Sequence, residues 1–595
     1  MLNHKHPAVA SPKAEEVSTS NGSLNSFGAD SWQRKAVERI AELTTVRQLE
    51  DALGEPFMKA LRMWRRQAEH RDTAGTKSEL IEALLVQHGT DLLQNCKELR
   101  KIIGRSTKEG APGSFHSGKS AAISFVREAQ LPIELAGSPA PPRPPLAIVV
   151  HGPQHLRKLE DYQLEARGRI AGALSSGDAV VCSLPTGGGK TRVAIEAIIE
   201  LLCENVDISM PGKPYVMWVA HTRELCDQAM EAFRVIWEAK AAQRSLLLGN
   251  TAAAGPALQT QLREAMQEQW DAAVIVTTPI VGAGLLTPGS WLSELREQEF
   301  SSSLRALIID EAHRAAAPTY QKLIAAARRA SPYVRVPVVG LTATPFRTVA
   351  PGMGPDAAVE ALRSIFTDGL IIPELLGQDP KGTLIARKCL ALPIYTSIRG
   401  TDLSKVVDDR AQGEEWIDNE LGKLAGQDAS RRRRVFASLQ ELLQKYPTAR
   451  VLYFGPTVTD AEVMSFVLLQ QGYGAAVVSS KTHAPVRREI VRQFKAGAYR
   501  VLCNHGVLTT GFDDPQITHV VVARPTVSFV LYEQMVGRGL RGKLFGGTDE
   551  CHILSVEDTF SGGPGLAKVW MEFIKSWTPH VRCTGTSTPG RRAGT

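Results

Sequence analysis

The chain has 595 residues, of which 43% are hydrophobic and 22% charged, and these proportions exclude a wholly disordered or fibrous protein. Lysine and arginine number 69 against 62 aspartate and glutamate, and the resulting net charge of +7 permits a polyanionic partner without requiring one. The eight cysteines include no CxxC pair, which argues against a disulfide framework and a cysteine-rich zinc module.

The first 145 residues divide into three segments. Residues 1–30 are rich in Ser, Asn, Gly and Ala and lack the apolar stretch of a signal peptide, so we expect a disordered tail. Residues 31–105 have apolar residues at spacings of three and four, which predicts a helical accessory region. Residues 106–145 are broken by Gly and Pro and end in SPAPPRPP, which is typical of a linker.

From residue 146, short runs rich in Val and Ile alternate with helical patterns, an order typical of parallel sheets covered by helices on both faces. One set of five runs lies within 146–349 and a second set lies within 383–577. We expect residues 350–382 to connect the two sets and residues 578–595 to form a tail. The sequence therefore predicts two α/β domains in tandem. Because no apolar run reaches about 18 residues, we expect no membrane segment and a cytoplasmic location.

Two segments are similar to the phosphate-binding pattern GxxxxGK[ST]. Residues 113–120, GSFHSGKS, match every position, but no strand-like run precedes them. Residues 184–191, LPTGGGKT, begin with Leu instead of Gly, yet they lie between the strand-like AVVCSL and the helical RVAIEAIIELL. A strand followed by a helix N-terminus directs backbone N–H groups at phosphates, so we expect the second segment to be the site.

In that loop, Lys190 is expected to contact the β- and γ-phosphates of ATP, and Thr191 is expected to bind Mg²⁺. The other residues expected to surround the phosphates are Pro185, Thr186, Gly187, Gly188 and Gly189. Asp310 and Glu311 directly follow the strand-like LRALII, where a carboxyl end of a parallel strand faces the ligand crevice. Asp310 could hold Mg²⁺ through water, and Glu311 could orient and deprotonate the attacking water.

The segments LPTGGGKT, DEAH and GLTATPFR, in this order, resemble the motifs of superfamily 2 helicases and translocases, and QMVGRGLR resembles their QxxGRxxR motif. GFDDP and GRGLR make the chain most similar, within this superfamily, to the translocating subunits of type I and III restriction enzymes and to bacterial RadD-type repair ATPases. The resemblance covers about residues 155–560. It implies two tandem RecA-like domains, at 146–349 and 383–577, with the helical accessory region before them.

The resemblance also implies roles for particular side chains. ATP would lie between the domains, with Lys190, Asp310 and Glu311 on one wall. Arg541 would be the arginine finger on the other wall, with Arg538 as its partner, and such an arginine is worth ~10³–10⁵ in rate. Gln163 would contact adenine, Gly511 and Asp513 are the remaining implied nucleotide contacts, and Gln534 is implied in catalysis. The residues implied in nucleic-acid contact or in coupling are Thr222, Arg223, Thr278, His313, Thr342, Thr344 and Thr510.

Three functions follow from the resemblance. The first is an ATP-dependent DNA helicase or translocase that holds nucleic acid mainly by its phosphates. The second is an RNA helicase, because no motif reads the 2′-OH group. The third is an ATP-gated DNA-binding module that recruits a nuclease or other partner in a repair or anti-phage defence complex.

Two further segments have alternative interpretations. Residues 75–84, GTKSELIEAL, resemble half of a SAP-type DNA-binding motif, but an amphipathic helix packed on its neighbours gives the same pattern. The run Arg431 to Arg434 could contact phosphates or could begin a solvated helix, and we expect the solvated helix.

Overall fold

The computed structural model describes most of the chain between residues 31 and 583. The described residues are 31–68, 75–137, 147–150, 156–204, 213–241, 244–252, 261, 264–265, 269–287, 289, 304–330, 335–343, 355–404, 414–509, 512–559 and 582–583. The predicted N-terminal tail lies outside this set, as does most of the predicted C-terminal tail. None of the helices in these ranges is long and apolar enough to cross a membrane.

Domain 1 is an eight-stranded sheet in which all neighbouring strands are parallel except β1 and β4. The strand order is β1 (Ala147–Val150), β4 (Leu246–Asn250), β5 (Ala272–Thr277), β3 (Tyr215–Val219), β6 (Leu304–Asp310), β7 (Val338–Thr342), β2 (Ala179–Ser183) and β8 (Gly369–Ile371). One face is covered by α8 (Asp161–Ser176), α9 (Lys190–Glu204) and α10 (Arg223–Lys240). The other face is covered by α12 (Pro279–Leu285), α14 (Pro318–Ala330) and α15 (Pro355–Ile365).

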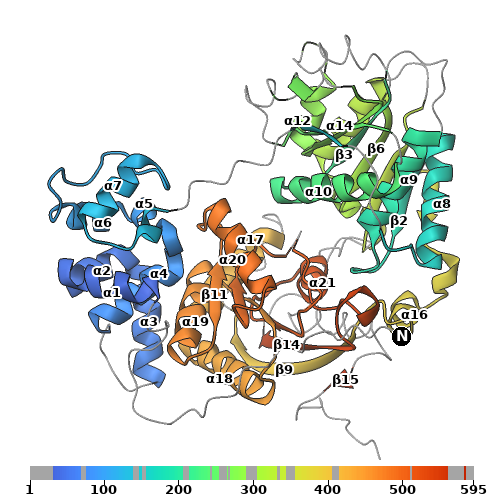
Figure 1. The fold of residues 1–595 in the computed structure, drawn as a ribbon. Helices are drawn as coiled ribbons and strands as arrows, with labels where there is room; N and C mark the ends of the chain where they lie inside the picture. Colours follow the sequence, from blue (N-terminus) through green and yellow to red (C-terminus); the bar gives the residue numbers. More distant parts are fainter. Residues whose placement is uncertain are drawn as a thin grey trace, which may run out of the picture.

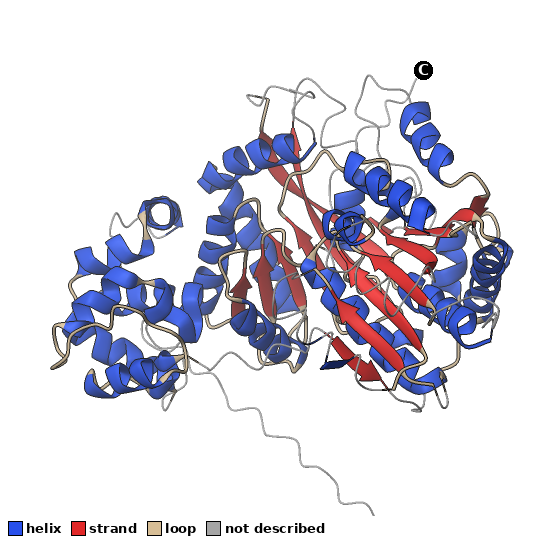
Figure 2. Cartoon of the chain, turned by 90° about the horizontal axis from the view of Figure 1, so that it is seen from above, coloured by secondary structure: helices blue, strands red, loops and turns tan. Residues whose placement is uncertain are grey.

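Domain 2 is a seven-stranded, entirely parallel sheet. The strand order is β11 (Ala475–Val478), β12 (Val501–Asn504), β10 (Val451–Phe454), β13 (His519–Val522), β14 (Glu550–Thr559), β9 (Leu392–Asp402) and β15 (Arg582–Cys583). Its helices are α17 (Glu414–Gln427), α18 (Ala429–Lys445), α19 (Val458–Gln470), α20 (Ala484–Lys495) and α21 (Phe529–Val536). Figure 2 shows helices on both sides of the strands, and the two predicted parallel α/β domains are thus confirmed.

Two predicted boundaries differ from the structure. β8 pairs with β2, so domain 1 extends to Ile371 rather than ending at 349. The connector is therefore residues 372–391, which contain η5 (Glu374–Leu376) and α16 (Pro380–Ala386). β15 pairs with β9, although its residues were predicted to belong to a tail. Strands of two or three residues are too short to show a hydrophobic period, which is why the sequence pattern did not reveal them.

The accessory region is larger than predicted, because it includes most of the predicted linker. Its elements are α1 (Trp32–Leu43), α2 (Val46–Leu53), α3 (Glu55–Ala68), α4 (Lys77–His88), η1 (Gly89–Asp91), α5 (Leu92–Asn95), α6 (Lys97–Gly104), α7 (Ser120–Glu128) and η2 (Ile133–Ala136). α7 buries Ala122, Phe125 and Val126, so residues 106–137 are folded. The rest of the predicted linker, 138–146, lies outside the described residues.

The accessory region packs on domain 2 (Figure 1). Trp64 meets Phe436 edge to face at 4.8 Å between ring centroids, and Phe57 meets Phe466 at 6.2 Å. α4, which carries the SAP-like residues, is buried on most of its surface, including Leu80 to Leu85. This burial agrees with the alternative of a helix packed on its neighbours, because the side chains of that segment are buried in the protein core.

Replacing Trp64 with alanine is expected to lower the free energy of unfolding of domain 2 together with the accessory region by about 3–5 kcal/mol, the cost of removing a large buried aromatic side chain. Ile133→Ala is the matched control, because Ile133 is an exposed apolar side chain of the same region. Denaturant unfolding would measure both. An early transition confined to the accessory region, with the unfolding of domain 2 unchanged, would contradict a shared core.

For Arg431 and Arg432, the first two residues of the arginine run, both interpretations are wrong. Arg431 and Arg432 are only 2% and 3% exposed, so they are neither solvated nor available to nucleic acid. Two nitrogens of Arg431 donate to the carboxylate of Asp558 at 2.6 and 2.7 Å, and Arg432 Nε donates to Asp460 at 2.7 Å. These acids lie far along the sequence, so the local charge pattern could not reveal the pairs.

We expect Arg431→Ala to destabilise domain 2 by about 3–5 kcal/mol, because it leaves the buried carboxylate of Asp558 without its partner. Arg433→Ala, at the exposed position two residues on, should change stability by no more than about 0.5 kcal/mol. Thermal unfolding monitored by circular dichroism would distinguish the two. Unchanged stability with weakened nucleic-acid binding in Arg431→Ala would instead favour a phosphate contact.

Candidate active site between the two domains

Residues 184–189, the expected phosphate loop, join the end of β2 to the start of α9. Gly187 and Gly189 have φ angles of 90° and 88°, a left-handed conformation that side chains rarely adopt. A Cβ atom on Gly187 would lie 2.8 Å from Leu390 Cδ2, and one on Gly189 would collide with Gln163 Nε2. The loop is thus a tight backbone cradle at a helix N-terminus. GSFHSGKS also runs into a helix, α7, but bends and turns precede it instead of a strand, so no sheet holds it in place.

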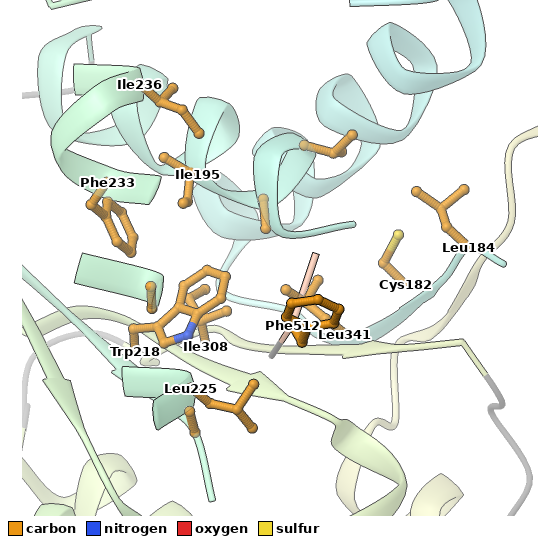
Figure 3. Close-up of a cluster of buried hydrophobic side chains, with 14 of the residues drawn as sticks. Cys182, Leu184, Ile195, Trp218, Leu225, Phe233, Ile236, Ile308, Leu341 and Phe512 are labelled. Atoms are coloured by element: carbon orange, nitrogen blue, oxygen red, sulfur yellow. The ribbon is translucent and has the colours of Figure 1, made fainter. Parts of the chain in front are cut away.

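Apolar side chains pack behind the loop and fix its position (Figure 3). Cys182 and Leu184, on the strand side of the loop, are fully buried, and Ile195 of α9 belongs to the same core. Phe512 of domain 2 is also part of it. This core holds the loop between the end of β2 and the start of α9.

Lys190 opens α9 and points back toward the loop. Its Nζ donates a hydrogen bond to Leu184 O at 3.1 Å. Burial lowers the pKa of Lys190, while the nearby charges of Glu311 and Asp310 oppose this change. The lysine and both acids therefore share one local environment.

The acids lie at the carboxyl end of β6. Glu311 has φ 53° and ψ 54°, a left-handed conformation that costs energy in a non-glycine residue and is typical of functional sites. Burial and then the charge of Glu311 raise the pKa of Asp310 to about 7, and Lys190 opposes the rise. His313 Nδ1 lies 3.3 Å from Glu311 Oε2 and 3.4 Å from Thr342 Oγ1, so His313 connects the acid pair to the end of β7.

Domain 2 supplies the opposite wall. Arg541 Nη1 donates to Gly187 O at 2.7 Å, and its Nε and Nη2 donate to Asp513 at 2.9 and 3.1 Å. Arg538 donates to Thr509 O and Phe512 O, and burial lowers its pKa to about 10 against the opposing charge of Glu311. Arg541 thus already contacts the phosphate loop across the domain boundary.

A cavity of about 330 Å³ lies between these walls. Both domains line it, and the predicted site residues among its lining are Thr186, Gly187, Gly189, Lys190, Thr191, Asp310, Glu311, Asp513, Gln534, Arg538 and Arg541. Glu533, which no sequence motif indicated, also lines the cavity and pairs with Lys381 at 2.7 Å. The sequence feature that could have indicated Glu533 is its position directly before Gln534, the first residue of the QxxGRxxR motif.

The other predicted residues in the described ranges do not line this cavity. Gln163 is buried, and its Nε2 donates to Gly188 O at 3.1 Å, so here it supports the phosphate loop. Thr222 caps α10, Arg223 Nε donates to Ala252 O, and Thr278 precedes α12. Thr344, Thr510 and Gly511 lie outside the described residues.

The fold and the site define a two-domain phosphate-loop protein whose cavity is completed by arginines of the second domain. Residues 162–351 match the family model of DEAD/DEAH box helicases, and residues 434–543 match the helicase conserved C-terminal domain. The two segments span about half of the chain. The chain therefore belongs to the DEAD/DEAH box helicases of superfamily 2, a class of ATP-dependent enzymes that hydrolyse ATP.

Individual relatives are distant. Over 398 residues the chain is 25% identical to "Putative ATP-dependent helicase IRC3" of Saccharomyces cerevisiae, covering 67% of this chain and 51% of the relative. Over 274 residues it is 27% identical to "DNA 3'-5' translocase XPB2" of Sulfurisphaera tokodaii, covering 42% and 58%. A solved structure of the type ISP restriction-modification enzyme LlaBIII bound to DNA is 17% identical, with a TM-score of 0.49, covering 73% and 32%. The chain thus spans about half the length of the curated relatives.

Proposed function

We propose that the chain is an ATP-driven DNA helicase or translocase that binds ATP between its two domains. The observation that carries this proposal is the 2.7 Å hydrogen bond from Arg541 to Gly187 O, which joins an arginine of domain 2 to the phosphate loop of domain 1. An arginine that reaches a phosphate site from another domain can stabilise charge on the γ-phosphate during transfer.

The residues of domain 1 would bind the triphosphate and activate water. Lys190 and the backbone N–H groups of the loop would hold the β- and γ-phosphates. Thr191 and Asp310 both line the cavity and offer the oxygen atoms that Mg²⁺ prefers, and the bound ion would neutralise phosphate charge. Glu311 would orient the attacking water and accept its proton.

Hydrolysis would be coupled to movement because neither domain alone completes the site. ATP would favour the closed arrangement, in which Arg541 and Arg538 face the phosphates, and loss of the γ-phosphate would remove this preference. The contacts of His313 with Glu311 and Thr342 offer a route from the acid pair to the end of β7. We propose that Thr222, Arg223, Thr278, Thr342, Thr344 and Thr510 contact nucleic acid or transmit its binding.

We favour DNA over RNA. The GFDDP and GRGLR segments resemble those of restriction translocating subunits and RadD-type repair ATPases, and one relative is named a DNA translocase. Such a motor would act in DNA repair or in defence against phages, with a protein partner in a larger complex. Binding to the phosphate backbone would make affinity fall as salt rises.

ATPase assays with single-stranded DNA, duplex DNA and RNA of equal length test this proposal. We expect DNA to stimulate hydrolysis about tenfold or more over RNA, a difference of roughly 1.4 kcal/mol in barrier height. Strand-displacement and triplex-displacement assays on the same DNA would separate unwinding from translocation. Stimulation by RNA alone would replace the DNA assignment with an RNA helicase. Hydrolysis without displacement in either assay would favour an ATP-gated recruiting module.

A further inference from the structure

The connector is bonded directly to the segment that carries Arg541. Leu390 and Arg541 form an antiparallel bridge. Three backbone hydrogen bonds extend it, from Ala391 N to Leu540 O at 3.2 Å, from Gly542 N to Cys389 O at 3.1 Å and from Leu544 N to Lys388 O at 2.9 Å. Residues 388–391 and 540–544 therefore form a short two-stranded ribbon, which we call the connector ribbon.

The connector ribbon also lies against the phosphate loop. Leu390 is only 2% exposed, and a Cβ atom added to Gly187 would lie 2.8 Å from Leu390 Cδ2. The same atom would lie 3.5 Å from Arg541 Nη1. The leucine of the connector and the guanidinium of domain 2 thus lie against one glycine of the loop, so moving one strand of the ribbon would move both.

The connector ribbon is close-packed at its centre. Lys388 has φ 58°, a left-handed conformation in a non-glycine residue. A Cβ atom on Gly542 would overlap Lys388 O and lie 2.6 Å from the carbonyl carbon of Cys389. These are backbone atoms, which cannot rotate away as a flexible side chain would. Only glycine fits at 542 while the ribbon is formed.

The connector is also bonded to α8 of domain 1, both near its start and directly beside the ribbon. The carboxylate of Glu165 accepts hydrogen bonds from the backbone N–H groups of Glu374 and Leu375 at 2.6 and 3.1 Å. Arg387 pairs with Asp161, the first residue of α8. α8 in turn contacts the phosphate loop, since Tyr162 Oη donates to Gly188 O at 3.2 Å. The connector is therefore anchored on both sides of the loop that Arg541 contacts.

We propose that the connector ribbon sets the position of Arg541 against the phosphate loop, and that Leu390 and Gly542 are positioning residues for ATP hydrolysis. This inference rests on the proposed function, because it assigns Arg541 to the γ-phosphate. Neither residue lines the cavity in which the phosphates would lie. Each acts by holding the guanidinium at the distance and angle that hydrolysis requires.

A double-mutant cycle on the full-length chain tests the inference, with kcat and KM for ATP measured in the presence of single-stranded DNA. We expect Gly542→Ala to lower kcat by about 100-fold with little change in KM, the cost of a misplacement of about 1 Å. Adding Gly542→Ala to Arg541→Ala should lower kcat by no more than about twofold further, because the arginine is already absent. If the kcat loss of the double variant equalled the product of the losses of the two single variants, the two residues would act independently and the inference would be overturned.

Two further variants keep the test interpretable. Leu390→Ala removes only side-chain atoms of the ribbon. We expect it to lower kcat less than Gly542→Ala does, and to cause no further loss when Arg541 is already alanine. Gly172→Ala in α8 is the matched glycine control, because a Cβ atom there meets nothing within 4 Å, and it should retain the parental kcat. Wild-type kcat in both Leu390→Ala and Gly542→Ala would overturn the inference. Retention of turnover by Lys190→Ala would instead count against the proposed function.

Discussion

Replacement of Lys190 with alanine is expected to lower kcat/KM for ATP by about 1000-fold or more, because it removes a buried positive charge at the phosphate loop where the triphosphate would lie. The hydrogen bond of its Nζ to Leu184 O shows that the ammonium group already lies over the loop. The assay is steady-state hydrolysis with saturating single-stranded DNA, together with binding of a fluorescent ATP analogue.

Lys322→Ala is the control for Lys190→Ala. Lys322 is exposed on α14, which covers the opposite face of the sheet of domain 1. This variant should retain the parental rate. If Lys190→Ala kept most of its activity, the phosphate-loop assignment would be wrong.

Arg541→Ala is expected to reduce kcat by ~10³–10⁵, the range measured for arginines that reach a transferring phosphoryl group from outside the loop. ATP affinity should change much less, because the contacts from domain 1 remain. Arg541→Lys should not restore activity, since a lysine cannot hold Asp513 and Gly187 O at once with a planar fork of donors. Single-turnover hydrolysis with prebound ATP would separate the chemical step from binding.

Arg492→Ala provides the matched arginine control, because its side chain is 69% exposed on α20 and pairs only with its helix neighbour Glu489 among the ion pairs of the described residues. Its kcat should equal that of the parent. A parental kcat in Arg541→Ala would show that the contact with Gly187 has no part in hydrolysis.

The parallel α/β architecture could be predicted because buried parallel strands read as continuous apolar runs. β3 and β5, for example, are buried at every position. The choice between two similar loops also followed from local sequence. GSFHSGKS fits the letters better, but only LPTGGGKT lies between a strand and a long helix, and that setting brings backbone N–H groups together.

Interactions between distant segments could not be predicted. Arg431 is buried because Asp558, 127 positions away, neutralises it, and no local pattern records that pairing. α7 was missed because Gly and Pro flank a helix of only nine residues. The proposed role of the connector also depends on backbone hydrogen bonds with Leu540 and Gly542. Such bonds could not be predicted, because the pattern of side chains along the sequence does not depend on them.

The most direct measurement is a structure of the chain with a slowly hydrolysed ATP analogue and Mg²⁺. We predict the γ-phosphate between Lys190 Nζ on one side and the guanidinium groups of Arg541 and Arg538 on the other, within hydrogen-bonding distance of both domains. A nucleotide held by domain 1 alone, with both arginines turned away from its phosphates, would contradict a site that the two domains share.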